Sequence, residues 1–229
     1  MLLASLLVPI AVLAIVLLVQ RLHLPVFLAI MAISFFWTIG AVLFIQFPPL
    51  AKNVLTASKE VASLFLVIFS IGVAIGSVSV NALLKGTVSA RYSPMSVIAM
   101  GIFVLGFYLV CQAWRPDPTG LLDVPEFIAH PMAVPLLLCL LGISVAGGMF
   151  VVPLYAFLTT FVPKTQTART IAANNIVNSG AMVVGSLLAT GLSAVGLDIV
   201  HHLLLSAAMC LVSAWLGLLL LRAERAAAA

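Results

Sequence analysis

The sequence predicts an all-α integral membrane protein with about seven transmembrane helices. Three observations lead to this class. Of the 229 residues, 64% are hydrophobic and only 7% are charged, whereas about a quarter of the residues in a soluble domain carry a charge. The apolar residues stand in runs of about 20, which is the length that crosses a bilayer as a helix. The charges and prolines collect between these runs. A water-soluble fold is therefore excluded.

Seven apolar runs qualify as membrane spans. They are 2–19, 26–47, 60–84, 94–114, 132–161, 168–193 and 199–221. The first run has no basic residue before it and no small-residue cleavage site after it, so we interpret it as a span rather than a signal peptide. The breaks include PPLAKN after the second run and PKTQTAR before the sixth. The longest break, 115–131, is expected to form no more than an external cap.

The basic residues predict the orientation of the chain. If the loop after the first span is cytoplasmic, three of the ten basic residues lie outside and seven lie inside. The inner seven are Arg21, Lys85, Arg91, Lys164, Arg169, Arg222 and Arg225. Because basic residues favour the cytoplasmic side, this asymmetry predicts a cytoplasmic C-terminus. The basic residues are scattered singly, which does not indicate a nucleic-acid partner.

The fifth run contains residues that weaken a helix. Gly147 and Gly148 lie side by side, and Pro153 follows them. Pro153 cannot donate a hydrogen bond to the carbonyl of Met149, and glycine lowers helix propensity beside that gap. The sequence therefore predicts a kink or hinge of the kind that lines the substrate path of transporters. A static kink that fits a neighbouring helix is the alternative.

Small residues on single helix faces predict close contacts between helices. Gly72 and Gly76 are spaced i, i+4 in the third run, and Ala181 and Gly185 are spaced in the same way in the sixth. Small residues let helix backbones approach each other in lipid. We expect packing grooves at both places, with gating contacts as the alternative.

Three amides stand within five residues of the sixth run: Asn174, Asn175 and Asn178. Amides are costly to expose to lipid, so they are expected to point toward another helix or a wet cavity. Hydrogen bonding between helices and contact with a polar substrate remain open alternatives. Further candidates for a substrate path are Tyr155, Gln46 and Trp37.

Catalytic and ion-binding patterns are missing from the sequence. There is no phosphate loop, HExxH motif, Ser-His-Asp order or cluster of metal ligands, so we expect no enzyme activity, cofactor or metal site. No carboxylate lies well inside a run, although proton-coupled carriers commonly hold one there. Proton coupling is therefore expected to be absent or to come from elsewhere. We interpret His201 and His202 as interfacial residues, with a pH-sensitive contact as the alternative.

Three stretches, in order, resemble the major facilitator superfamily, and within it the lysophospholipid transporter branch. They are FFWTIGAVLFIQFPPLAKNVL, IGVAIGSVSVNALLKGTVSARYSP, and GGMFVVPLYAFLTT with ARTIAANNIVN. That branch includes transporter domains fused to acyltransferase and acyl-carrier-protein synthetase modules. The resemblance covers about residues 25 to 221, which would form the second half of a twelve-helix transporter.

The resemblance implies one six-helix bundle of this superfamily over 25–222. A leftover helix with a short cytoplasmic linker would precede it at 1–24, in the place of helix six, and a cytoplasmic tail would follow at 223–229. The loop that contains Asn81, Lys85 and Arg91 occupies the place of a conserved cytoplasmic loop motif of the superfamily, but the usual aspartate is absent.

The implied function is transport of a lysophospholipid across the bacterial inner membrane by alternating access. The implied partners are membrane lipid, an N-terminal six-helix half that is on another chain or missing, and an acyltransferase. We expect the chain to be incomplete alone, because transport requires both halves. The alternatives are an efflux carrier for another small hydrophobic solute and a truncated membrane subunit that does not transport.

Overall fold

The computed structural model describes residues 24–115 and 120–228, and these residues are almost entirely helical. The helices are α2 (Leu24–Asn53), α3 (Lys59–Leu84), α4 (Ser93–Ala113), α5 (Val124–Ala129), α6 (Ala133–Thr160), α7 (Lys164–Ala194) and α8 (His201–Ala228). Six of them, all but the short α5, are long and apolar enough to cross a membrane. The all-α class is confirmed, and the chain has the helices of a multi-pass membrane protein. The first predicted span, 2–19, lies outside the described residues.

The helix boundaries agree with the apolar runs for α3, α4 and α6, but not for α2. The predicted break at PPLAKN is wrong, because α2 passes through Pro48 and Pro49 and ends at Asn53. Each proline removes one donor from the helix but keeps a helical φ angle. At the end of α2, the amides of Val54 and Leu55 both donate to the carbonyl of Leu50, at 3.0 and 3.1 Å.

The later helices also extend beyond the predicted spans. PKTQTAR begins α7 instead of separating two helices, with Pro163 at the N-cap and its carbonyl accepting from the amide of Gln166 at 2.8 Å. At the C-terminus, α8 continues to Ala228, so most of the predicted tail is helix. Glu224 in this extension accepts a hydrogen bond from the backbone amide of Ala90 at 3.0 Å. The end of α8 therefore supports the connection between α3 and α4.

The predicted external cap contains a short helix of its own. Asp123 and Glu126 form a capping box, in which each side chain accepts from the backbone amide of the other residue at 2.9 Å. This arrangement satisfies two amides that a helix start would otherwise leave without partners. The segment before α5 is also tied to the α2–α3 connection, because the Leu122 amide donates to the Thr56 carbonyl at 2.7 Å.

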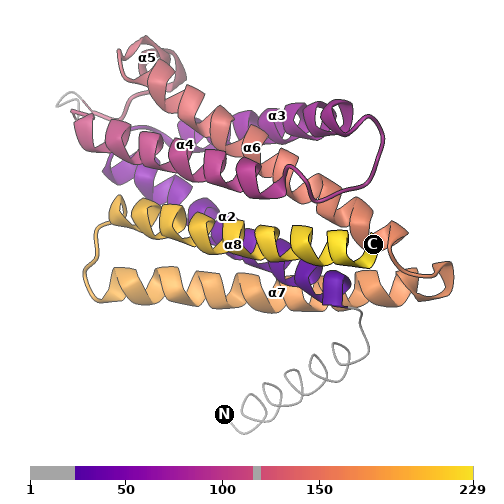
Figure 1. The fold of residues 1–229 in the computed structure, drawn as a ribbon. Helices are drawn as coiled ribbons and strands as arrows, with labels where there is room; N and C mark the ends of the chain where they lie inside the picture. The colour runs from indigo at the N-terminus through magenta and orange to yellow at the C-terminus, as the bar shows by residue number, and fades with distance from the viewer. Residues whose placement is uncertain (1–23, 116–119, 229) are drawn as a thin grey trace, which may run out of the picture.

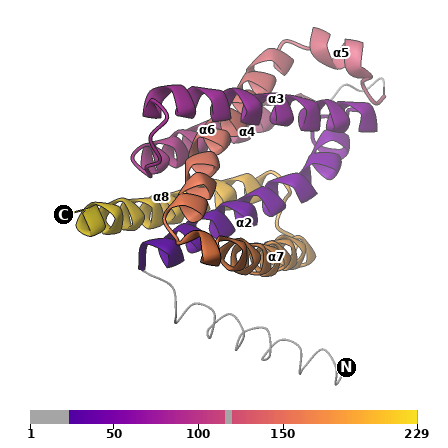
Figure 2. The same ribbon diagram turned by 90° about the vertical axis from the view of Figure 1, so that its right-hand side faces the viewer.

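The six long helices form two layers (Figures 1 and 2). One layer holds α3, α4 and α6, and the other holds α2, α7 and α8. α3 packs along α6 as α7 packs along α2, and α4 packs against α6 as α8 packs against α2. α4 also contacts α8, and α2 contacts α6. If α2, α3 and α4 are exchanged with α6, α7 and α8 respectively, the pattern of contacts between helices stays the same. Because each unit contains three long helices, the second unit runs in the opposite direction, which makes the pair an inverted repeat.

Glycines produce the equivalent contacts in the two units. A Cβ atom on Gly76 of α3 would overlap the carbonyl of Val145 in α6, and one on Gly72 would overlap the Ser144 side chain. In the other unit, a Cβ atom on Gly185 of α7 would lie 2.9 Å from the carbonyl oxygen of Thr38 in α2. The close packing that the sequence predicts at these glycines is therefore confirmed.

The two ends of the bundle differ in charge. The α3–α4 and α6–α7 connections and the end of α8 lie at one end, and α5 and the α7–α8 connection lie at the other (Figure 1). At the end that holds the C-terminus, the described basic residues are Lys85, Arg91, Lys164, Arg169, Arg222 and Arg225. At the opposite end they are Lys52, Lys59 and Arg115.

The glycine contacts make a prediction about stability. Gly76→Ala is expected to lower the free energy of unfolding by about 1–3 kcal/mol, because the new methyl group must displace the α6 backbone. Gly180→Ala is the matched control, since nothing lies within 4 Å of a Cβ atom there; it is expected to raise stability by up to about 1 kcal/mol through helix propensity. Denaturation of the purified protein in detergent micelles measures both changes. Equal effects of the two variants would contradict the close contact.

Candidate functional site

A polar network links α2, α6 and α7 inside the bundle. The Ser34 hydroxyl of α2 donates to Asn178 Oδ1 of α7 at 2.6 Å. Asn178 Nδ2 in turn donates to the Tyr155 hydroxyl of α6 at 3.1 Å. The Trp37 indole of α2 donates to the same hydroxyl at 2.9 Å. Three of the sequence-predicted site residues therefore meet at one place, together with Ser34.

The close approach of α7 to α2 positions this network. Thr38 lies one turn after Ser34 and its hydroxyl contacts two carbonyls, those of Ser34 at 3.0 Å and Ala181 at 3.3 Å. Gly185, one turn beyond Ala181, leaves room for the Thr38 backbone. Sequence reasoning missed Ser34 and Thr38. Their spacing of i, i+4 in an otherwise apolar run was the available signal.

Asn174 lies one helical turn before Asn178 and on the same face of α7. Its side chain is fully buried, and neither Oδ1 nor Nδ2 has a hydrogen-bond partner among the described residues. Leaving buried polar atoms without partners costs about 1–3 kcal/mol each. Buried polar groups in proteins are usually paired, and an exception indicates a water, an ion or a ligand as the partner. The amide of Asn174 is therefore the strongest candidate for a ligand contact in the network.

The hydrogen-bonding capacity of the site follows from its side chains. The Tyr155 oxygen accepts from both Trp37 and Asn178, which uses both of its lone pairs and leaves the O–H hydrogen to donate. The Asn174 amide adds two donor hydrogens and one acceptor oxygen. None of the network side chains is charged at neutral pH. The arrangement suits a neutral polar group such as a hydroxyl.

The remaining predicted path residues lie elsewhere. Asn175 is exposed and lies about 100° round α7 from Asn174. Gln46 is buried, but its amide contacts His202 of α8 instead of the network. The amides of the sixth run thus separate into two buried side chains and one exposed side chain.

The predicted hinge residues are buried in α6. A Cβ atom on Gly147 would lie 3.2 Å from the Phe36 ring, and one on Gly148 would lie 2.6 Å from the Val73 carbonyl oxygen of α3. Both glycines therefore serve close packing in this conformation. Pro153 lies inside the continuous helix, two residues before Tyr155. The break in the backbone hydrogen bonds that it causes is adjacent to the polar network.

The predicted loop-motif residues lie at the basic end of the bundle. Asn81 is exposed in the last turn of α3, and Lys85 caps that helix in the left-handed conformation, with φ of 50°. The Arg91 guanidinium lies 5.6 Å from the centroid of the Tyr92 ring. Glu224, the acidic side chain that bonds this connection, comes from α8.

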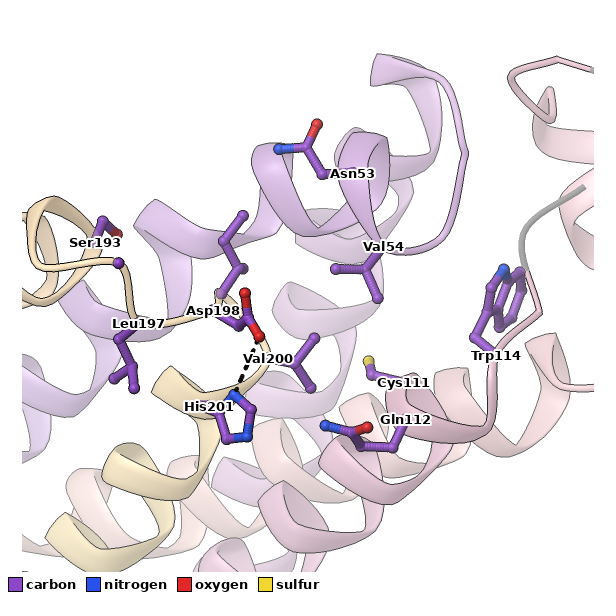
Figure 3. A pocket seen from close by; sticks show the side chains of 12 residues that line it. Asn53, Val54, Cys111, Gln112, Trp114, Ser193, Leu197, Asp198, Val200 and His201 are labelled. Atoms are coloured by element: carbon purple, nitrogen blue, oxygen red, sulfur yellow. Dashed lines mark ion pairs between the residues drawn. The ribbon is translucent and has the colours of Figure 1, made fainter. Parts of the chain in front are cut away.

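A separate open cavity of about 690 Å³ lies at the opposite end of the bundle (Figure 3). Side chains from α2, α4 and the α7–α8 connection line it, including Gln112, Asp198 and His201. Asp198 Oδ2 and His201 Nδ1 point toward each other at 3.8 Å. The sequence predicted His201 as an interfacial residue, without a cavity beside it.

Comparison of the chain with protein-family models, with curated proteins and with solved structures finds no match.

The two buried amides are expected to have opposite effects on stability. Asn174→Leu should leave stability unchanged or raise it by about 1–3 kcal/mol, because it removes polar atoms that have no partner. Asn178→Leu should lower stability by about 1 kcal/mol, because it breaks hydrogen bonds to Ser34 and Tyr155 between helices. Denaturation in detergent compares the two leucine variants directly. If Asn174→Leu were the more destabilising, Asn174 would be a structural contact between helices.

Proposed function

We propose that the chain is the C-terminal half of a major facilitator superfamily transporter, and that it moves a lysophospholipid or a similar amphiphile across the bacterial inner membrane by alternating access. The observation that carries this proposal is the Asn174 amide, which is fully buried without a partner beside a polar network in an apolar bundle. A structure built only for stability would not retain such a group, whereas a binding site would use it.

The inverted repeat supports transport as the class of function. Transporters place their substrate sites at the interface between such repeats. Trp37 belongs to the first helix of one repeat and Tyr155 to the first helix of the other, and the hydrogen bond between them crosses that interface at 2.9 Å. This position supports the network as the proposed substrate site.

The chemistry of the site supports an amphiphile with a hydroxyl group. A lysophospholipid lacks one acyl chain, so its glycerol carries a free hydroxyl that both donates and accepts hydrogen bonds. The Asn174 amide and the Tyr155 hydroxyl supply the complementary groups. Apolar side chains dominate the surrounding helices, and they suit the remaining acyl chain.

The proposed cycle needs a second six-helix half, because alternating access moves one bundle against the other around the site. We propose that this half is supplied by a partner chain or by a further part of the same protein. An acyltransferase that consumes the transported lipid is a further proposed partner.

Binding of lysophosphatidylethanolamine by the chain in nanodiscs tests the proposal. The wild-type chain is expected to bind the lipid in competition with a fluorescent analogue, and Asn174→Leu to weaken binding about tenfold, the equivalent of one lost hydrogen bond of about 1.4 kcal/mol. Asn175→Leu is the matched control, because that neighbouring amide is exposed and outside the network; it should leave binding unchanged.

Other outcomes of the same experiment separate the alternatives. Equal binding of a neutral apolar solute that lacks a hydroxyl would favour a carrier for another hydrophobic compound. No binding of any amphiphile, or equal losses in the two asparagine variants, would contradict the proposed site.

The charge difference between the ends of the bundle predicts its orientation. The more basic end is expected to face the cytoplasm, so that the end of α8 is cytoplasmic and the α7–α8 connection is external. Reporter fusions that are active on only one side of the membrane test this, with one fusion at the C-terminus and one in the α7–α8 connection. Activity of the C-terminal fusion on the external side would reverse the proposed orientation.

A further inference from the structure

A buried histidine lies between α2 and α8, away from the polar network. His202 is the second residue of α8, and its side chain is fully buried. Its Nδ1 is hydrogen-bonded to the side-chain amide of Gln46, which is also buried. The other ring nitrogen, Nε2, has no hydrogen-bond partner within the part of the chain that the structure describes. Ionisable residues inside a membrane bundle commonly serve proton pathways.

The pairing with glutamine suits a group that changes its charge. A neutral imidazole has one donor and one acceptor nitrogen, and an imidazolium has two donors. An amide offers both a donor and an acceptor, so Gln46 can donate to Nδ1 of the neutral ring and, after a rotation of the amide, accept from Nδ1–H of the charged ring. A leucine in place of Gln46 could pair with neither form of the His202 ring, and a glutamate there would favour the charged form alone.

We infer that His202 and Gln46 form a proton-binding site that joins α2 to α8. No carboxylate lies well inside an apolar run of the sequence. In this site, His202 supplies an ionisable side chain instead. Protonation adds a hydrogen to the ring and turns the Gln46 amide, and the proton comes from water at the open end of the bundle.

The open cavity at this end of the bundle reaches the residue before His202, although neither Gln46 nor His202 lines it. His201, the preceding residue, lines the cavity, and Asp198 lies 3.8 Å from it. Asp198 is the one lining residue of the cavity with a formal charge, and this charge is negative. A carboxylate at the entrance favours the arrival of a proton.

Titratable and charged groups face this region from each neighbouring element. On α4, Tyr108 lies 6.2 Å from the His201 ring between centroids, and Cys111 lines the cavity. On α2, the side chain that contacts His202 is the uncharged Gln46. Further basic side chains at this end of the bundle are Lys52, Lys59 and Arg115. The carboxylate of Asp198 contacts His201, and Gln46 is the direct partner of the His202 ring.

The site bears on transport because α2 also carries Ser34 and Trp37 of the candidate substrate site. A change in the α2–α8 contact therefore acts on the helix that forms the network. This last step rests on the proposed function, whereas proton binding by His202 does not depend on it.

Nuclear magnetic resonance of the ¹⁵N-histidine-labelled chain in nanodiscs tests proton binding. The sequence contains four histidines, and His202→Asn identifies the signal of His202. We expect this ring to change from neutral to charged as the pH is lowered. Gln46→Glu is expected to raise the midpoint of this titration by about one pH unit or more, and Gln46→Leu is expected to lower it.

Gln112→Leu is the matched control, because Gln112 lines the same cavity and bonds to Tyr108 at 3.4 Å instead of to His202. It should leave the midpoint unchanged. A His202 ring that stays neutral at every pH at which the chain is folded would overturn the inference, as would equal shifts in the two leucine variants. Gln46→Glu keeps the test decisive if Gln46→Leu does not fold. Lysophospholipid binding is measured separately. If His202 titrates as expected but the wild-type chain binds no lysophospholipid, the result counts against the proposed function alone.

Discussion

The close approach of α7 to α2 is the contact on which the candidate site depends. No hydrophobic force draws helices together in lipid, so association relies on packing and on hydrogen bonds between helices. Gly185 leaves space for the backbone of Thr38, and the Thr38 hydroxyl reaches the Ala181 carbonyl at 3.3 Å. Two turns earlier on α7, this spacing brings Asn178 within 2.6 Å of Ser34. A larger residue at the glycine would separate the two helices and break the hydrogen bond between Ser34 and Asn178.

The sequence predicted the helices better than it predicted their ends. Apolar runs of about 20 residues report the thickness of the bilayer, so the six described spans were found. Helix ends depend on local hydrogen bonds, which hydropathy does not report. α2 continues past Pro48 because proline keeps a helical φ angle, although the carbonyls of Phe44 and Ile45 lose their usual amide donors. Two prolines in sequence look like a break, and only the observed backbone distinguishes a break from a helix that tolerates them.

The sequence also predicted only part of the candidate site, because hydropathy does not report which side chains meet. Amides in a membrane helix must face inward, which singled out Asn174 and Asn178. Contacts such as those of Tyr155 with Asn178 and of Gln46 with His202 cannot be predicted from the sequence, because the partners are more than 20 residues apart and their meeting depends on how the helices cross. The small hydroxyl residues of α2 were overlooked because serine and threonine are common in membrane helices, where they also bond to their own backbone.

The two buried polar sites share α2, and this common helix limits how either can change. Half or more of the residues in its apolar segment are buried, a larger share than in α3 or α7. Ser34 and Trp37 face α7 and α6, whereas Gln46 faces α8. A helix moves nearly as a rigid body over such a distance, so a rotation that improves one of these contacts must alter the others. The prolines just beyond Gln46 weaken the hydrogen bonding of α2 near its C-terminal end, which is where an adjustment of the contact with α8 would strain the helix least.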